Sequence, residues 1–117
     1  MRIGTDIVEI DRFHGKLENQ RFINRIYTPE EQAYIASKGA GRFATAAGLF
    51  CAKEAGIKAI GTGFIGRLLS TDLVVSHDAY GAPILKVKGR PDWRFSVSIS
   101  HSREYATACV LWEEGSL

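Results

Sequence analysis

Two acidic residues, Asp6 and Glu54, stand among apolar neighbours, where carboxylates are unusual. Asp6 shares one face of an extended segment with Val8 and Ile10, and Glu54 lies mid-helix beside an apolar stripe. Carboxylates from two separate elements can converge on Mg²⁺, which takes one or two of them together with waters and substrate phosphates. Because such acids are common, spacing alone favours the ordinary interpretation, a turn-bonded Asp and a Glu on a solvated helix face.

Two lysines and a glycine-containing loop near Glu54 form a second candidate site. The loop consists of Gly61, Thr62 and Gly63. Lys58 lies four residues after Glu54, where a helix ion pair worth about 0.2–0.5 kcal/mol is the default interpretation. The functional interpretation places Lys58, near Lys53, against a phosphate that the glycines let approach the backbone. Because the loop follows its helix, it is neither a P-loop nor a dinucleotide fingerprint.

His101 is the third candidate, at the end of a serine-rich strand that continues into Ser102. A lone His at such a position is more often structural than catalytic, and serine-rich strands are often solvated faces. The segment lacks the G-x-S-x-G elbow, which argues against a serine hydrolase.

The first half of the chain predicts three elements: a strand over 2–10, a helix over 28–39 and a longer helix over 41–59. Thr28 and Glu31 have the spacing of a capping box, and Pro29 fits the first helical position. The longer helix has apolar residues at helical spacing and ends before Gly61, which can adopt the left-handed conformation.

The second half predicts four strands, over 73–76, 84–88, 94–100 and 106–112. The segment 106–112 is apolar on both faces, so we expect it in the centre of the sheet. A strand, helices and then antiparallel strands predict an α+β fold.

The composition predicts one globular domain over residues 1–117, because the chain is too short for a second core. A net charge of +2 is too small to indicate nucleic acid, and aromatic residues are not interleaved with the basic ones as a stacking platform requires. Basic residues form two clusters suited to acidic partners or to solubility: Arg12, Lys16, Arg21 and Arg25, and Lys86, Lys88, Arg90 and Arg94.

The compartment is predicted from cysteine and apolar content. Cys51 and Cys109 lie in apolar runs and are interpreted as buried thiols of a reducing compartment. No segment approaches the roughly 20 apolar residues of a membrane span. Asp6 and Glu9 interrupt the region where a signal peptide needs an apolar core. We therefore expect a cytoplasmic protein that binds no membrane.

Taken together and in order, these segments resemble the acyl carrier protein synthase type of phosphopantetheinyl transferase. The resemblance spans about residues 3–110 and is carried by five blocks: Gly4 to Ile10, Phe22 to Glu31, Phe50 to Gly63, Gly81 to Pro83, and Ser98 to Ser102. It implies a Mg²⁺-dependent enzyme that transfers phosphopantetheine from coenzyme A to a serine of an apo acyl carrier protein, releasing adenosine 3′,5′-bisphosphate. The implied architecture is an antiparallel sheet against a long central helix, in a homotrimer with shared active sites.

The resemblance also implies residue roles. The metal ligands would be Asp6 and Glu54, joined in catalysis by Lys58 and His101. The coenzyme A diphosphate would be held by Lys58, Gly61, Thr62, Gly63, His101 and Ser102, with Gly81 and Pro83 near the adenine. The carrier protein would contact Arg12, Arg21, Phe22 and Arg25.

One position departs from the family pattern. Leu49 stands where many members have an arginine associated with the 3′-phosphate of coenzyme A, and Lys38 and Arg42 are candidates to replace it. Because of this departure, an impaired paralogue that only binds coenzyme A or a carrier is an alternative function. A small interaction domain without a ligand is a further alternative. The acceptor of the serine proton is unassigned; a metal-ordered water held by Glu31 is one hypothesis.

Overall fold

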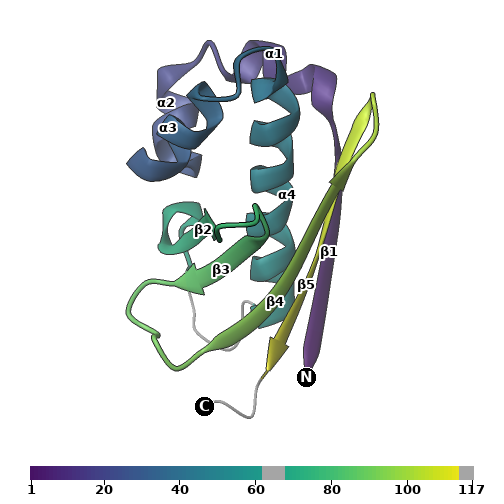
Figure 1. Ribbon diagram of the computed structural model, residues 1–117. Coiled ribbons are helices and arrows are strands. Elements are labelled where there is room, and N and C mark those ends of the chain that lie inside the picture. Colours follow the sequence, from purple (N-terminus) through teal and green to yellow (C-terminus); the bar gives the residue numbers. More distant parts are fainter. Residues whose placement is uncertain (62–67, 114–117) are drawn as a thin grey trace.

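The computed structural model describes residues 1–61 and 68–113 of the chain (Figure 1). The larger sheet is antiparallel with strand order β1-β5-β4, and a smaller sheet pairs β2 with β3. The strands are β1 (Arg2–Glu9), β2 (Leu73–His77), β3 (Pro83–Val87), β4 (Arg94–His101) and β5 (Tyr105–Glu113). The helices are η1 (Ile10–Arg12), α1 (Phe13–Lys16), α2 (Gln20–Ile26), α3 (Pro29–Ala36), η2 (Gly39–Gly41), α4 (Arg42–Ile60) and η3 (Ser70–Asp72).

The long helix α4 packs against β1 and β5 of the larger sheet (Figure 1). It carries small side chains at this contact, and Ala52, Ala55 and Ala59 have no exposed surface. A Cβ added to Gly4 would overlap the carbonyl oxygen of Ala55, so β1 approaches the helix more closely than a larger residue allows. The next inward-facing residue of β1, Asp6, therefore also lies beside α4.

The strands alternate as the sequence predicts. Gly4 and Asp6 face inward, whereas Ile3 and Ile7 point outward and are 62% and 63% exposed. β5 is the central strand, which confirms the prediction for 106–112: its inward residues are buried and it pairs with a neighbour on each side.

The capping box at the start of α3 forms as predicted. The Thr28 hydroxyl accepts from the Glu31 backbone N–H at 3.3 Å, and a Glu31 carboxylate oxygen accepts from the Thr28 N–H at 2.8 Å. Pro29 is the first helical residue. The helix ends at Ala36, and Gly39, with φ +56°, begins the short turn that leads to α4.

Helices α1 and α2 were not predicted from the sequence. Each has at most seven residues, too few to show a hydrophobic period or to be stable alone. Edge-to-face aromatic contacts hold them in place: the Phe13 ring lies 6.4 Å from that of Phe22 and 5.6 Å from that of Phe50 on α4. Tertiary packing rather than local propensity therefore accounts for this segment.

In the part of the chain that the structure describes, no helix combines the length and the apolar character that crossing a bilayer requires.

Candidate active site

Asp6 and Glu54 come together where β1 crosses the middle of α4. The Asp6 side chain is 17% exposed and Glu54 is half-buried. Burial raises the pKa of Glu54, and the negative charge of Asp6 raises it further, so the two carboxylates lie within electrostatic range of each other. The two acids that the family resemblance implies as metal ligands therefore lie close together, and their binding of a metal stays a prediction.

Lys58 stands beside this pair but does not form the helix ion pair that its spacing suggests. Its ammonium lies 3.3 Å from Asp6 Oδ1 and donates to the carbonyl oxygen of Thr5 at 3.0 Å. The positive charge lowers the pKa of Glu54 against the two causes that raise it. Since the Lys58 side chain is 56% exposed, it can also reach an anion bound outside the carboxylates.

The donor set of this cluster fits Mg²⁺. Two carboxylates supply hard oxygen ligands, and Mg²⁺ completes its shell with waters and substrate phosphates. Within residues 1–61 and 68–113, no group of three or more His, Cys, Asp or Glu side chains is placed to hold a metal ion, so a softer metal that needs a full protein cage lacks its ligand set here. Burial and then the charge of Asp6 raise the pKa of Glu54 more than the Lys58 cation lowers it, so a divalent cation placed between the two carboxylates would offset their repulsion.

Cys51 lies close to the two acids, a contact that was not predicted from the sequence. Its thiol has no exposed surface and donates to the Ala106 carbonyl oxygen at 3.4 Å. Burial, and then the negative charge of Asp6, raise the pKa of Cys51 to about 12, so the thiol stays neutral. The signal was present: Cys51 precedes Glu54 by three positions, which places both on one side of the helix.

His101 and Ser102 lie apart from the acid pair within one chain. Asp6 of β1 pairs with Ala108 of the central strand β5. His101 of β4 pairs with Ala106, the next inward-facing residue of β5. With strands about 4.8 Å apart, His101 is about 10 Å to the side of β1. Ser102 organises a turn, because its hydroxyl accepts from the backbone N–H of Tyr105 at 3.1 Å.

The predicted adenine segment is also distant from the acids. Gly81, with φ +87°, and Pro83 belong to the β2–β3 hairpin, which lies on the other side of α4 from β1 (Figure 1). Gly61 ends α4 with φ +82°, as predicted. Thr62 and Gly63 lie outside the described residues.

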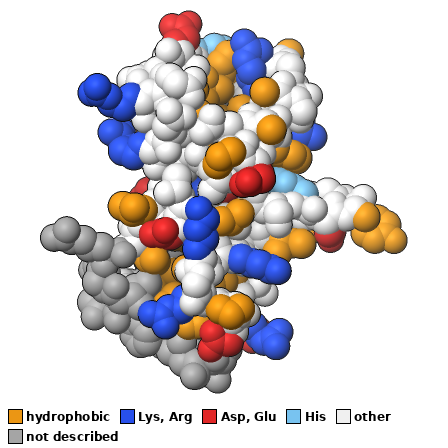
Figure 2. All heavy atoms as spheres, turned by 90° about the vertical axis from the view of Figure 1, so that its left-hand side faces the viewer, with side chains coloured by type: hydrophobic (Ala, Val, Ile, Leu, Met, Phe, Trp, Pro, Cys, Tyr) orange, Lys and Arg blue, Asp and Glu red, His pale blue; other side chains and the backbone are white. Residues whose placement is uncertain are grey.

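The four residues predicted to contact a carrier protein line one open groove of about 600 Å³: Arg12, Arg21, Phe22 and Arg25. Lys16 joins them, with its ammonium 4.7 Å from the centroid of the Phe22 ring. The groove thus combines several positive charges with one aromatic side chain. Elsewhere, Lys and Arg side chains are spread over both halves of the face that carries α2 and α3 (Figure 2).

The candidates to replace the missing arginine lie away from the acids. Leu49 is buried, with 2% of its surface exposed. Arg42 begins α4, about 18 Å along the helix axis from Glu54, and donates to the Gly39 carbonyl oxygen at 2.8 Å. The Lys38 ammonium lies 4.6 Å from the centre of the Tyr34 ring.

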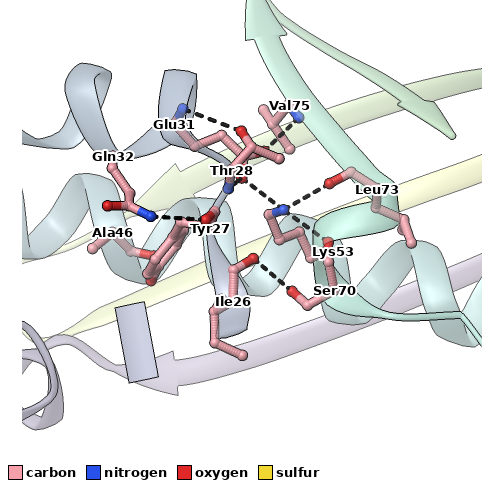
Figure 3. A network of polar contacts seen from close by, with 10 residues as sticks. All are labelled: Ile26, Tyr27, Thr28, Glu31, Gln32, Ala46, Lys53, Ser70, Leu73 and Val75. Atoms are coloured by element: carbon pink, nitrogen blue, oxygen red, sulfur yellow. Dashed lines mark hydrogen bonds and ion pairs between the residues drawn. The ribbon is translucent and has the colours of Figure 1, made fainter. Parts of the chain in front are cut away.

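Glu31 does not hold a water for catalysis. Its side chain is fully buried and forms an ion pair with Lys53, with the two atoms 2.7 Å apart (Figure 3). Its oxygens also accept from the backbone N–H groups of Thr28 and Val75. The hypothesis of a Glu31-held water is therefore wrong, and Lys53 is likewise removed from any exposed phosphate site.

Comparison with known proteins decides the family. A family model described as the 4′-phosphopantetheinyl transferase superfamily matches residues 2–110. The chain belongs to this superfamily. It is 45% identical over 113 residues to a holo-(acyl-carrier-protein) synthase of Oceanobacillus iheyensis, a match that covers 95% of this chain and 94% of the relative. A synthase of the same name from Halothermothrix orenii is 40% identical, with 97% of each chain covered.

Solved phosphopantetheinyl transferases share the fold. The chain is similar to a holo-(acyl-carrier-protein) synthase of Bacillus anthracis described in complex with CoA (3′,5′-ADP), with a TM-score of 0.83, 38% identity, and coverage of 96% of this chain and 95% of that one. It is also similar to the Helicobacter pylori synthase described in complex with coenzyme A, with a TM-score of 0.82, 30% identity, and coverage of 95% and 99%. The prediction of an α+β phosphopantetheinyl transferase fold is confirmed.

Proposed function

We propose that this protein transfers the 4′-phosphopantetheine group from coenzyme A to a serine of an apo acyl carrier protein. The observation that carries the proposal is the cluster of Asp6, Glu54 and Lys58, which the fold assembles within the region that the family model matches. Relatives named holo-(acyl-carrier-protein) synthase and solved synthases described with coenzyme A support the substrates. The predicted product, adenosine 3′,5′-bisphosphate, is what remains when the phosphopantetheine leaves.

Asp6 and Glu54 would hold Mg²⁺ in this reaction. The bound ion would supply positive charge at the diphosphate, where negative charge builds as the serine oxygen attacks phosphorus. Lys58 is the protein's own cation beside that position, and its half-exposed ammonium can exchange Asp6 for a phosphate oxygen. Much of the remaining rate acceleration would come from positioning the two substrates.

The groove of Arg12, Arg21, Phe22 and Arg25 is the proposed carrier-protein contact. Its positive charges would steer an acidic surface toward the enzyme, and the largely buried Phe22 ring, 5.8 Å from the Arg25 guanidinium carbon, is the aromatic part of its lining. The proposed coenzyme A contacts are Lys58, Gly61, Thr62, Gly63, Gly81, Pro83, His101 and Ser102.

We further propose a cytoplasmic homotrimer whose active sites are shared between neighbouring subunits. Two observations support it. His101 and the hairpin containing Gly81 are distant from the acid pair of their own chain, so in the proposed site a neighbouring subunit would supply them. The outer face of the larger sheet also exposes Ile3, Ile7 and Tyr105, an apolar surface suited to burial against another copy.

Mass spectrometry of an apo carrier protein incubated with the enzyme, coenzyme A and Mg²⁺ tests the function. The expected result is a carrier heavier by one phosphopantetheine group. An unmodified carrier would contradict the proposal, and calorimetric titration with coenzyme A and Mg²⁺ would then separate the two alternatives. Binding without transfer indicates an impaired paralogue, the alternative suggested by Leu49 in place of the usual arginine. No binding indicates an interaction domain without this ligand.

A further inference from the structure

The buried ion pair of Glu31 and Lys53 has every polar atom occupied. The Lys53 ammonium contacts Glu31 Oε1 at 2.7 Å and donates to the carbonyl oxygens of Ser70 at 2.9 Å and Leu73 at 2.6 Å. Three donors thus meet three acceptors. The second carboxylate oxygen of Glu31 accepts from the backbone N–H of Val75 at 2.7 Å (Figure 3).

These contacts join α3, α4, η3 and β2 at one point. Apolar packing alone holds such elements together but does not fix their relative rotation as closely as directional hydrogen bonds to backbone atoms do. A buried ion pair is a weak means of raising stability, because the desolvation of both charges offsets their attraction. The function of this ion pair is therefore to be sought in the geometry that it fixes rather than in its contribution to stability.

Lys53 immediately precedes Glu54 on α4. Successive residues of a helix are rotated by about 100°, so Lys53 points to α3 and β2 while Glu54 lies on the side where Asp6 raises its pKa. On that side, Gly4 of β1 is in close contact with the Ala55 backbone. The helix is thus fixed from both sides at the level of Glu54, by close packing on one and by the ion pair on the other.

The rotation of α4 about its axis is important because a metal site tolerates only small changes in metal–ligand distance. A helix with its side chains is about 10–12 Å wide, so a rotation of about 10° moves an atom at its edge by about 1 Å. Metal–ligand distances tolerate only about 0.2 Å. A small rotation of α4 would therefore move Glu54 out of position while leaving the fold intact.

We propose that Glu31 and Lys53 are positioning residues that orient α4 so that Glu54 and Asp6 bind one divalent cation together. The proposal rests on the metal site of the proposed function. Neither residue touches the substrates; both act through the backbone of α4 and through Glu54.

The test compares Lys53→Met with the wild type. Met preserves length and burial but removes the charge and all three hydrogen bonds. The expected result is an increase of about 10- to 100-fold in the Mg²⁺ concentration that gives half-maximal transfer, with kcat largely recovered at saturating Mg²⁺. The control is Val87→Ala on β3, which shortens a buried side chain and should lower Tm without changing the Mg²⁺ requirement.

Binding of Mn²⁺, followed by electron paramagnetic resonance with coenzyme A present and no carrier, supplies a readout that does not depend on turnover. We expect weaker Mn²⁺ binding by Lys53→Met than by the wild type and by Val87→Ala. Glu31→Gln, which retains size and an acceptor oxygen, should show a smaller shift in the same direction and replaces Lys53→Met if that variant does not fold.

Asp6→Ala distinguishes the two ways of failing. If the wild type and Asp6→Ala bind Mn²⁺ equally, the metal site itself is wrong and this proposal falls with it. If Asp6→Ala loses Mn²⁺ but Lys53→Met and Glu31→Gln bind it like the wild type, the metal site stands and the positioning role is overturned.

Discussion

Lys58 of α4 places its ammonium 3.3 Å from the carboxylate of Asp6, a residue 52 positions earlier in the chain. Within the described part of the chain, Lys58 is the ion-pair partner of Asp6. The arrangement has two consequences for substitution. Removing Asp6 takes away a ligand of the proposed metal, and it leaves a half-exposed lysine that water can solvate.

We therefore expect Asp6→Ala to lose transfer activity by more than about 100-fold while the fold is retained. Turnover would be measured at saturating coenzyme A and carrier over a range of Mg²⁺ concentrations, and the fold by circular dichroism. Asp11→Ala, which changes an exposed acid outside the cluster, should be close to the wild type. Near-normal turnover of Asp6→Ala would contradict the metal assignment.

The raised pKa of Glu54 predicts how stability responds to pH. Burial first, and then the charge of Asp6, raise this pKa. An acid whose pKa is higher in the folded state favours folding below its unfolded pKa, and this contribution is lost as pH rises through the folded pKa. Without metal, Glu54→Gln should therefore raise Tm at pH 8 and have little effect at about pH 3, below the ordinary pKa of Glu, where the carboxyl is largely protonated in both states.

Saturating Mg²⁺ and coenzyme A should reverse this difference at pH 8, because they stabilise only the form that binds them. Thermal unfolding followed by differential scanning calorimetry measures both conditions. Glu30→Gln, at an exposed position of α3, is the matched control and should change Tm little in either. A lower Tm for metal-free Glu54→Gln at pH 8 would show that the ionised carboxylate does not oppose folding.

Charge reversal in the groove should change carrier recognition selectively. Arg21→Glu removes one positive charge and adds a negative one where an acidic partner is proposed to bind. We expect the KM for the carrier to rise by about tenfold, equivalent to about 1.4 kcal/mol, and its dependence on salt to weaken, with the KM for coenzyme A unchanged.

Steady-state kinetics at two salt concentrations, with Lys86→Glu as a control outside this groove, provide the measurement. The control tests whether any loss of positive charge has the same effect, since Lys86 is an exposed lysine on β3. Equal effects of the two substitutions would remove the groove from the carrier interface.

Local chemistry explains what the sequence predicts correctly. The capping box of Thr28 and Glu31 acts over three residues, and the position of Asp6 follows from the two-residue alternation of a strand. The Asp6–Glu54 convergence was identified because the surrounding motifs resemble a family, not because spacing predicts contact. Sequence order alone does not indicate which face of α4 would meet β1.

Contacts between distant elements explain what the sequence does not show. Lys58 has Glu54 at helical spacing, but the carboxylate and carbonyl oxygens offered by β1 bind it instead. Lys53 lies in the same motif, and the sequence offers it as a candidate phosphate contact. In the structure it forms an ion pair with Glu31 on another helix. In both cases, tertiary packing decides among partners that local rules cannot rank.

Gly4→Ala tests whether the close approach of β1 and α4 sets the geometry of the acid pair. A Cβ at Gly4 would overlap the Ala55 carbonyl oxygen, so the strand and helix must separate. Overpacking of this kind costs about 1–3 kcal/mol, which should lower Tm by several degrees in calorimetry. Gly15→Ala is the control for stability, because a Cβ there meets nothing within 4 Å. Since Asp6 follows Gly4 on the same face, the separation should also raise the Mg²⁺ concentration needed for half-maximal transfer; an unchanged requirement in a destabilised Gly4→Ala would show that this contact serves stability alone.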